Sequence, residues 1–173
     1  MQKGLLMVYT GNGKGKTTAA LGQAIRSLGH GKRVFMLQFM KGSPNYGEVI
    51  MSKKLTGFTM EQWGRDEFVH PKQPEQIDID WAQRGLLRAN EVIQSGEYQL
   101  IILDELNVAL GFGLVFWEQV EELLNTKPKI LDLIITGRYA PPALLKRADL
   151  VSVIDEHRHH YQSGVEAREG IEY

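Results

Sequence analysis

No cysteine occurs in this sequence of 173 residues. Disulfide bridges, thiolate nucleophiles and thiolate metal sites are therefore excluded, and the composition fits a reducing compartment. A charge excess is also lacking, because 20 basic residues face 21 acidic ones and leave a net charge of −1. A chain so balanced has no general attraction for nucleic acid or an anionic membrane, and we expect neither as a partner.

Long apolar runs are missing as well. The run LLMVY near the start has five residues, too few for the apolar core of a signal peptide. No run approaches the roughly 20 apolar residues that span a bilayer. The 43% hydrophobic content is still enough for one core of ordinary size. We expect a cytoplasmic protein with a single domain over residues 1–173.

Short apolar runs alternate with segments of helical period, a pattern typical of crossover units on a parallel sheet. Strands are expected at Leu5–Tyr9, Val34–Phe39, Phe58–Glu61, Leu100–Leu103, Ile130–Ile135 and Leu150–Ile154. Helices are expected at Lys16–Leu28, Glu75–Ser95, around Pro141–Arg147 and along the stripe of Phe116, Val120, Leu123 and Leu124. Continuous apolar strands belong to sheets covered on both faces. The predicted fold class is α/β, a three-layer P-loop NTPase-like (RecA-like) domain with a mostly parallel central sheet.

The stretch TGNGKGKTT joins the first expected strand to the first expected helix. Such a loop predicts a phosphate cradle, in which Lys16 reaches the phosphates and the Thr17 hydroxyl binds Mg²⁺ (or Mn²⁺). The common P-loop pattern has glycine where this chain has Thr10, so a plain glycine turn with exposed lysines is the alternative. The predicted nucleotide-binding residues are Gly11, Asn12, Gly13, Lys14, Gly15, Lys16, Thr17 and Thr18.

Polar residues follow two further expected strands. Asp104 and Glu105 come directly after one of them. Since the carboxyl ends of parallel strands meet at one edge, this pair is expected beside the phosphate loop, as metal ligands together with Thr17. A plain helix cap is the alternative. Arg138 follows another strand and either contacts phosphate or lies exposed in a turn.

Two other groups of residues leave alternatives open. The aromatic residues Phe58, Trp63 and Phe68 lie in the least regular segment, residues 42–74, where they form core or the wall of a flat apolar ligand site. The sequence His157-x-His159-His160 either binds a metal or belongs to a solvated tail. An Asn-Lys-x-Asp guanine motif, an arginine-rich lid and a G-x-S-x-G nucleophile turn are all missing.

Four blocks of the sequence resemble, in order and spacing, the P-loop-type ATP:corrinoid adenosyltransferases (ATP:cob(I)alamin adenosyltransferases). The blocks are GNGKGKTTAALGQAIRSLGHGKRVFMLQFMKG, LIILDELNVAL, ITGRYAPPALLKRADLVS and GVEAREGIEY, and the likeness extends over nearly the whole chain. The resemblance implies transfer of the 5′-deoxyadenosyl group from ATP to the Co(I) of a reduced corrinoid. The products would be adenosylcobalamin, or an adenosylated precursor, and intact triphosphate.

The resemblance also implies roles for single residues. Co(I) is itself the nucleophile, so no general base is required, and Lys16, Glu105 and Arg138 are expected to act on the departing triphosphate. Phe68, with Trp63 second, is expected to wall the corrinoid site and displace the lower cobalt ligand, which eases reduction. A homodimer and a reductant such as flavodoxin or a reduced flavin are implied as partners.

The chain also departs from its apparent relatives in two places. One branch of that family has Gly-Phe-Thr-Trp where this chain has GRDEFVHP, residues 64–71, and many relatives have Val-Lys-His in place of Arg158-His159-His160. From the residues alone, two other functions stay open. A P-loop ATPase or small-molecule phosphotransferase would release ADP, and a non-catalytic nucleotide-binding regulator would leave ATP unchanged.

Overall fold

The computed structural model describes residues 3–173, which fold around one six-stranded sheet. The strand order is β3-β2-β4-β5-β1-β6, and every neighbouring pair is parallel. The strands are β1 (Leu6–Thr10), β2 (Val34–Phe39), β3 (Phe58–Trp63), β4 (Leu100–Asp104), β5 (Asp132–Thr136) and β6 (Leu150–Val153). The predicted α/β class with a P-loop NTPase-like arrangement is confirmed.

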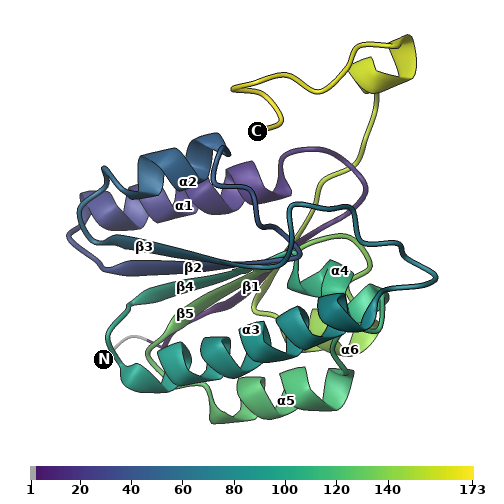
Figure 1. The fold of residues 1–173 in the computed structure, drawn as a ribbon. Helices are drawn as coiled ribbons and strands as arrows, with labels where there is room; N and C mark the ends of the chain where they lie inside the picture. Colours follow the sequence, from purple (N-terminus) through teal and green to yellow (C-terminus); the bar gives the residue numbers. More distant parts are fainter. Residues whose placement is uncertain (1–2) are drawn as a thin grey trace.

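Helices cover both faces of the sheet, which gives the three layers seen in Figure 1. The helices α1 and α2 lie on one face and α3, α4, α5 and α6 on the other. Their bounds are α1 (Lys16–Gly29), α2 (Gly47–Ser52), α3 (Gln76–Ser95), α4 (Leu106–Gly111), α5 (Trp117–Thr126) and α6 (Pro142–Arg147), with a 3-10 turn at His160–Ser163. None of the helices in residues 3–173 has the length and apolar character to cross a membrane.

The apolar strand runs pack into two clusters, one on each face of the sheet. Strands β1, β2 and β4 are buried along their whole length, as their unbroken hydrophobic sequence predicts. Ile102 of β4 lies in register between Met36 of β2 and Ile134 of β5. These three side chains belong to the cluster under α1, whereas Ile101 and Leu103 point to the cluster under α3 and α5.

Most predicted element bounds agree with the structure within two residues. The strand Val34–Phe39 is confirmed to the residue, and the long helix ends at Gly96, whose φ of 68° is left-handed. Phe116 was wrongly placed on the buried stripe of its helix. It caps α5 and is exposed, while Val120, Leu123 and Leu124 are buried as expected.

Two helices were not predicted from the sequence. α2 and α4 have six residues each, too few to show a helical period, and α2 buries none of its residues. The segment of residues 42–74 is therefore more regular than its sequence indicates, since it holds α2 and β3. Strand β3 also runs on to Trp63, because its backbone stays in register with β2 as far as Phe39.

The parallel sheet brings four chain segments to one edge. The glycine loop follows β1, Met40 and Lys41 follow β2, Glu105 follows β4, and Gly137-Arg138 follows β5. Ligands of open parallel sheets bind beyond the carboxyl ends of the strands. This edge is therefore where a functional site is expected.

The central strand should dominate the stability of the fold. Replacing Ile102, which is fully buried, by alanine should lower the free energy of unfolding by about 3 kcal/mol through lost burial and the remaining cavity. Urea unfolding measures this change. The matched control is Leu87→Ala on α3, where the side chain is 67% exposed and little change is expected. Equal losses in the two variants would contradict the assignment of β4 to the core.

Candidate functional site

The glycine loop lies against the segment that follows β6. Gly11 has a φ of 100°, and a Cβ there would stand 2.4 Å from the Ile154 carbonyl oxygen. The Gly13 amide donates to that same oxygen at 2.7 Å. A side chain at position 11 would push the two segments apart, so this position requires glycine.

Lys16 begins α1 and folds back over the loop. Its side chain is nearly buried, and Nζ donates to the Gly13 carbonyl oxygen at 2.6 Å. Burial, together with the nearby Arg138 guanidinium, lowers the pKa of Lys16, while Glu105 and Asp104 partly offset that effect. The ammonium group is thus held inside the loop, at the place where a bound phosphate would replace the carbonyl as its partner.

The Asp104 carboxylate, at the end of β4, is fully buried and accepts hydrogen bonds on both oxygens. Oδ1 accepts from the hydroxyls of Thr17 (2.9 Å) and Thr136 (2.7 Å). Oδ2 accepts from Gln38 Nε2 (3.1 Å) and Lys41 Nζ (2.9 Å). Although burial raises the pKa of this carboxyl, the Lys41 charge and the hydrogen bonds outweigh it, so the pKa lies below its ordinary value. Four donors fill the acceptor sites of the carboxylate.

Glu105 follows immediately, with a left-handed φ of 62° that is unusual for a non-glycine residue. Its amide donates to Thr136 Oγ1 at 3.0 Å, and its side chain lines a cavity. No side chain within residues 3–173 donates a hydrogen bond to the Glu105 carboxylate. Burial and the neighbouring Asp104 charge raise the pKa of Glu105, against the opposing charges of Lys41, Lys16 and Arg138.

These contacts decide which side chains can hold a divalent cation. The Glu105 carboxylate and the Thr17 hydroxyl both line the cavity and have free oxygen lone pairs, which suits a hard cation such as Mg²⁺. Asp104 has no acceptor site left, so it can act on such a cation only by orienting Thr17. The three residues expected to bind the metal, Thr17, Asp104 and Glu105, therefore lie together. Asp104 orients Thr17 through a hydrogen bond and does not itself have an oxygen lone pair free for the cation.

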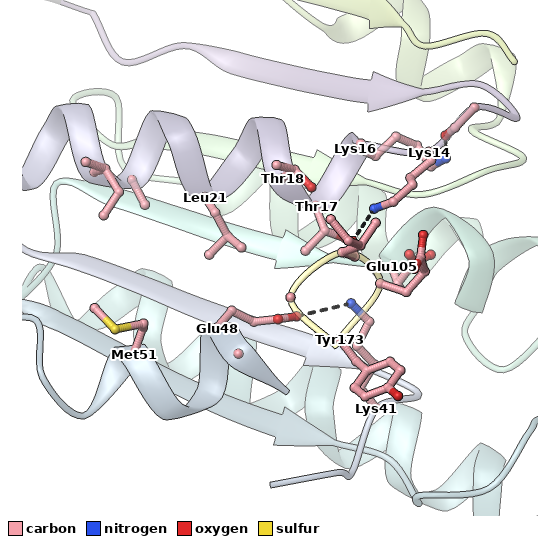
Figure 2. A pocket seen from close by; sticks show the side chains of 18 of the residues that line it. Lys14, Lys16, Thr17, Thr18, Leu21, Lys41, Glu48, Met51, Glu105 and Tyr173 are labelled. Atoms are coloured by element: carbon pink, nitrogen blue, oxygen red, sulfur yellow. Dashed lines mark hydrogen bonds and ion pairs between the residues drawn. The ribbon is translucent and has the colours of Figure 1, made fainter. Parts of the chain in front are cut away.

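The cavity beside the loop has a volume of about 680 Å³, enough for a nucleotide. In Figure 2, Lys14, Lys16 and Thr17 line one side of it, and Lys41 and Glu48 line the other. The last residues of the chain also line it, because Lys14 Nζ donates to the Ile171 carbonyl oxygen at 2.6 Å. Of the eight predicted loop residues, Gly11 and Asn12 do not line this cavity. They contact Ile154 and Arg138 instead.

A second cavity of about 480 Å³ lies next to the first, and Lys41 and Arg138 line both. Arg138 is exposed and donates from Nη2 to the Asn12 carbonyl oxygen at 3.0 Å. The second cavity also has apolar and aromatic walls. These walls include Phe68, Val69, Pro71, Val108, Phe112 and Tyr139.

The structure separates the two aromatic residues that the sequence singled out. Phe68 is 85% exposed and lines the second cavity. Its loop is tied down by Arg65, which donates to Asp78 from Nε and Nη2 at 2.9 and 3.0 Å. Trp63 lines neither cavity, because its ring packs edge-on against Trp81 at 5.9 Å. Phe58 is a core residue at the far wall of the nucleotide-sized cavity.

The histidine tail folds back on the end of the chain. His160 Nε2 lies 3.3 Å from a Glu172 carboxylate oxygen, and His159 Nδ1 accepts from the Tyr161 amide at 3.2 Å. His159, His160 and Glu172 form a compact group, and His157 is not part of it. The sequence did not reveal Glu172 as the partner, since twelve positions separate it from His160. The His160–Glu172 contact joins the 3-10 turn to the end of the chain, and the Lys14–Ile171 hydrogen bond joins that end to the glycine loop.

Several polar residues of the site were missed in the sequence. Gln38, Lys41, Glu48 and Thr136 line the nucleotide-sized cavity or contact Asp104. Gln38 and Thr136 interrupt apolar strands near their carboxyl ends, which was a usable signal. Glu48 gave none, because its helix was not predicted.

Comparison with known proteins points to one family. Residues 2–173 match the model of the ATP:corrinoid adenosyltransferases BtuR/CobO/CobP. The corrinoid adenosyltransferase of Pseudomonas aeruginosa is 31% identical over 172 residues, covering 99% of this chain and 85% of the relative. The corrinoid adenosyltransferase of Escherichia coli K12 and the corrinoid adenosyltransferase CobA of Salmonella typhimurium are each 34% identical over 180 residues, covering 99% of this chain and 87% of theirs.

Removing the negative charge of Glu105 should increase the free energy of unfolding, and the size of the increase should depend on pH. Because the folded protein raises the pKa of Glu105, stability is lost as pH rises from below the ordinary glutamate pKa toward the raised one. Glu105→Gln should therefore have a higher free energy of unfolding than the wild type at pH 7, with the difference vanishing in acid. Urea unfolding at several pH values tests this, with exposed Glu122→Gln on α5 as the control. A less stable Glu105→Gln protein at pH 7 would contradict the assigned repulsion.

Proposed function

The chain belongs to the ATP:corrinoid adenosyltransferase family, and from this premise we propose that it transfers the 5′-deoxyadenosyl group of ATP to the Co(I) of a reduced corrinoid. One observation carries the proposal. The nucleotide-sized cavity, which is lined by Lys16 and Thr17, lies next to the cavity lined by Phe68 and other apolar side chains. Lys41 and Arg138 line both cavities and form the wall between them. A triphosphate and a large, flat, apolar ring system can therefore be held side by side.

The proposed reaction is a displacement at carbon. The electron pair of Co(I) forms a bond to C5′ as the C5′–O5′ bond breaks. The bonding electrons leave with the triphosphate, and the cobalt ends as Co(III). No proton moves in this step, so the site needs position and charge rather than a general base.

The residues of the chain then have separate roles. The loop amides and Lys16 bind the triphosphate, Lys14 adds a second cation, and Arg138 reaches the same region. Thr17 and Glu105 would hold Mg²⁺ (or Mn²⁺), with Asp104 orienting Thr17. A bound cation of this kind neutralises phosphate charge.

Phe68 is proposed as the wall that displaces the lower cobalt ligand. Its exposure in the second cavity supports the role, while the packing of Trp63 against Trp81 makes Trp63 the weaker choice. Losing the lower ligand makes Co(II) easier to reduce. We propose a reductant such as flavodoxin or a reduced flavin as the electron source.

The oligomeric state, cellular location and product are proposed from the likeness to the family and from a few features of the chain. A homodimer is supported by edge strand β6, where Val151 and Val153 are exposed. A cytoplasmic location is supported by the absence of cysteine, and the net charge of −1 gives no support to nucleic acid or a membrane as a partner. The product would be adenosylcobalamin or an adenosylated precursor.

A second candidate function is that of a P-loop ATPase or small-molecule phosphotransferase. The raised pKa of Glu105 favours it, since such a carboxylate beside a phosphate loop suits a general base. That reaction would release ADP without any change in the corrinoid.

Loss of the loop cation tests the proposed function. Protein, MgATP and chemically reduced cobalamin are mixed anaerobically, and the visible spectrum of adenosylcobalamin is followed. The wild type should form it, and Lys16→Ala should be slower by about 1000-fold because the buried cation is lost. Lys146→Ala, on the exposed side of α6, is the matched control. Near-normal turnover of Lys16→Ala would remove Lys16 from its role, and no product with the wild type would refute the function.

The proposed role of Phe68 predicts that its removal slows adenosylation by an amount that depends on the oxidation state of the starting cobalt. Phe68→Ala should slow adenosylation that starts from Co(II) and a reductant more than adenosylation of chemically prepared Co(I). Because Phe68 is exposed, the fold should be unaffected, and the exposed Phe116→Ala serves as control. Equal losses from both starting states would show that Phe68 does not act on the lower ligand.

A further inference from the structure

Lys41 is delivered to the site by a strained turn. It follows Met40, whose φ of 56° is left-handed, just after β2. The Met40 amide donates to the Trp63 carbonyl oxygen at 3.2 Å. A Cβ on Gly64 would lie 2.5 Å from Met40 Cα, so the two segments touch backbone to backbone. Strain of this kind is kept where the surroundings enforce it, often at functional sites.

The Lys41 ammonium is a largely buried charge, and not all of its N–H donors are used. Nζ donates to Asp104 Oδ2 at 2.9 Å, and Glu48 lies 3.9 Å away. Burial alone would lower the pKa of Lys41, but the Asp104, Glu105 and Glu48 carboxylates raise it above its ordinary value, so the group stays charged. An ammonium has three N–H donors. Within residues 3–173 only Asp104 accepts one of them, which leaves two for a ligand.

Lys41 also stands at the boundary between the two cavities. It lines the nucleotide cavity, where Figure 2 shows it opposite the phosphate loop, and it lines the cavity that holds Phe68. Arg138 is the other cation that lines both, but Arg138 is exposed, whereas the Lys41 side chain is only 20% exposed. A less solvated cation interacts more strongly with developing charge.

The geometry points to Lys41 as a catalytic residue that stabilises the charge left on O5′ of the α-phosphate when the C5′–O5′ bond breaks. This inference rests on the proposed function. If cobalt in one cavity bonds to C5′ of a nucleotide in the other, the reacting atoms meet at the shared wall. The α-phosphate is bonded to O5′, so it lies at that wall whichever end of the triphosphate occupies the loop. When the C5′–O5′ bond breaks, its electron pair stays on O5′, next to the Lys41 ammonium.

The test replaces the charge and keeps a hydrogen bond. Lys41→Gln retains an N–H group for Asp104, and its kcat with MgATP and chemically reduced cobalamin should fall about 100-fold. The dissociation constant for MgATP, measured by equilibrium dialysis, should change less than about threefold because the loop is intact. The isotope effect of ¹⁸O at the 5′-bridging position should increase, since C5′–O5′ cleavage becomes more rate-limiting. Lys54→Gln, exposed after α2, is the matched control.

Each outcome decides a separate point. Failure of the wild type to form adenosylcobalamin refutes the proposed function. An active wild type with an equally active Lys41→Gln variant, or a variant that loses MgATP affinity as much as kcat, overturns the inference alone. Should Lys41→Gln not fold, Lys41→Arg keeps the ion pair with Asp104 but shifts the donors, and we expect a lower kcat at unchanged MgATP affinity. An unchanged kcat in Lys41→Arg would contradict the inference, because the shifted donors would then make no difference to the reaction.

Discussion

The site depends on one buried carboxylate. Asp104 joins α1 through Thr17, β5 through Thr136, β2 through Gln38 and the turn after β2 through Lys41. A buried charge is tolerated only when it is fully hydrogen-bonded and paired, and all four donors come from different positions in the chain. The same contacts that stabilise the carboxylate therefore fix the positions of the glycine loop, the Lys41 cation and the end of β5.

The cost of this arrangement is visible in the backbone. Among residues 3–173 the non-glycine residues with positive φ are Met40, Glu105 and Tyr139. They lie just beyond β2, β4 and β5, all at the carboxyl edge of the sheet. Glu105 adds an electrostatic cost, since its carboxylate adjoins that of Asp104 without a donor of its own. Strain and repulsion gathered at one edge of an otherwise regular sheet are typical of a site selected for binding rather than for stability.

Local sequence patterns predicted the elements with long apolar or helical periods, and topology then brought the expected residues together. Val34–Phe39 and the pair Asp104-Glu105 are examples, because continuous burial and position after a strand are both local signals. Lys41 follows the expected strand Val34–Phe39 and so carried the same local signal, but the sequence interpretation did not use it. Glu172 gave no such signal, since its partner His160 is distant in sequence and only the folded tail brings the two side chains close. Phe116 was misplaced because an apolar residue at a helix cap fits the same period as one in the buried stripe.

The central claim is that the phosphates of ATP are a binding handle and a leaving group, so the bond that breaks is C5′–O5′. The most direct test follows ATP labelled with ¹⁸O at the 5′-bridging oxygen during turnover with reduced cobalamin, using ³¹P NMR of the products. The account predicts inorganic triphosphate that carries the label, in equal amount to the adenosylcobalamin formed. ADP and phosphate, with the label retained in the nucleotide, would contradict it.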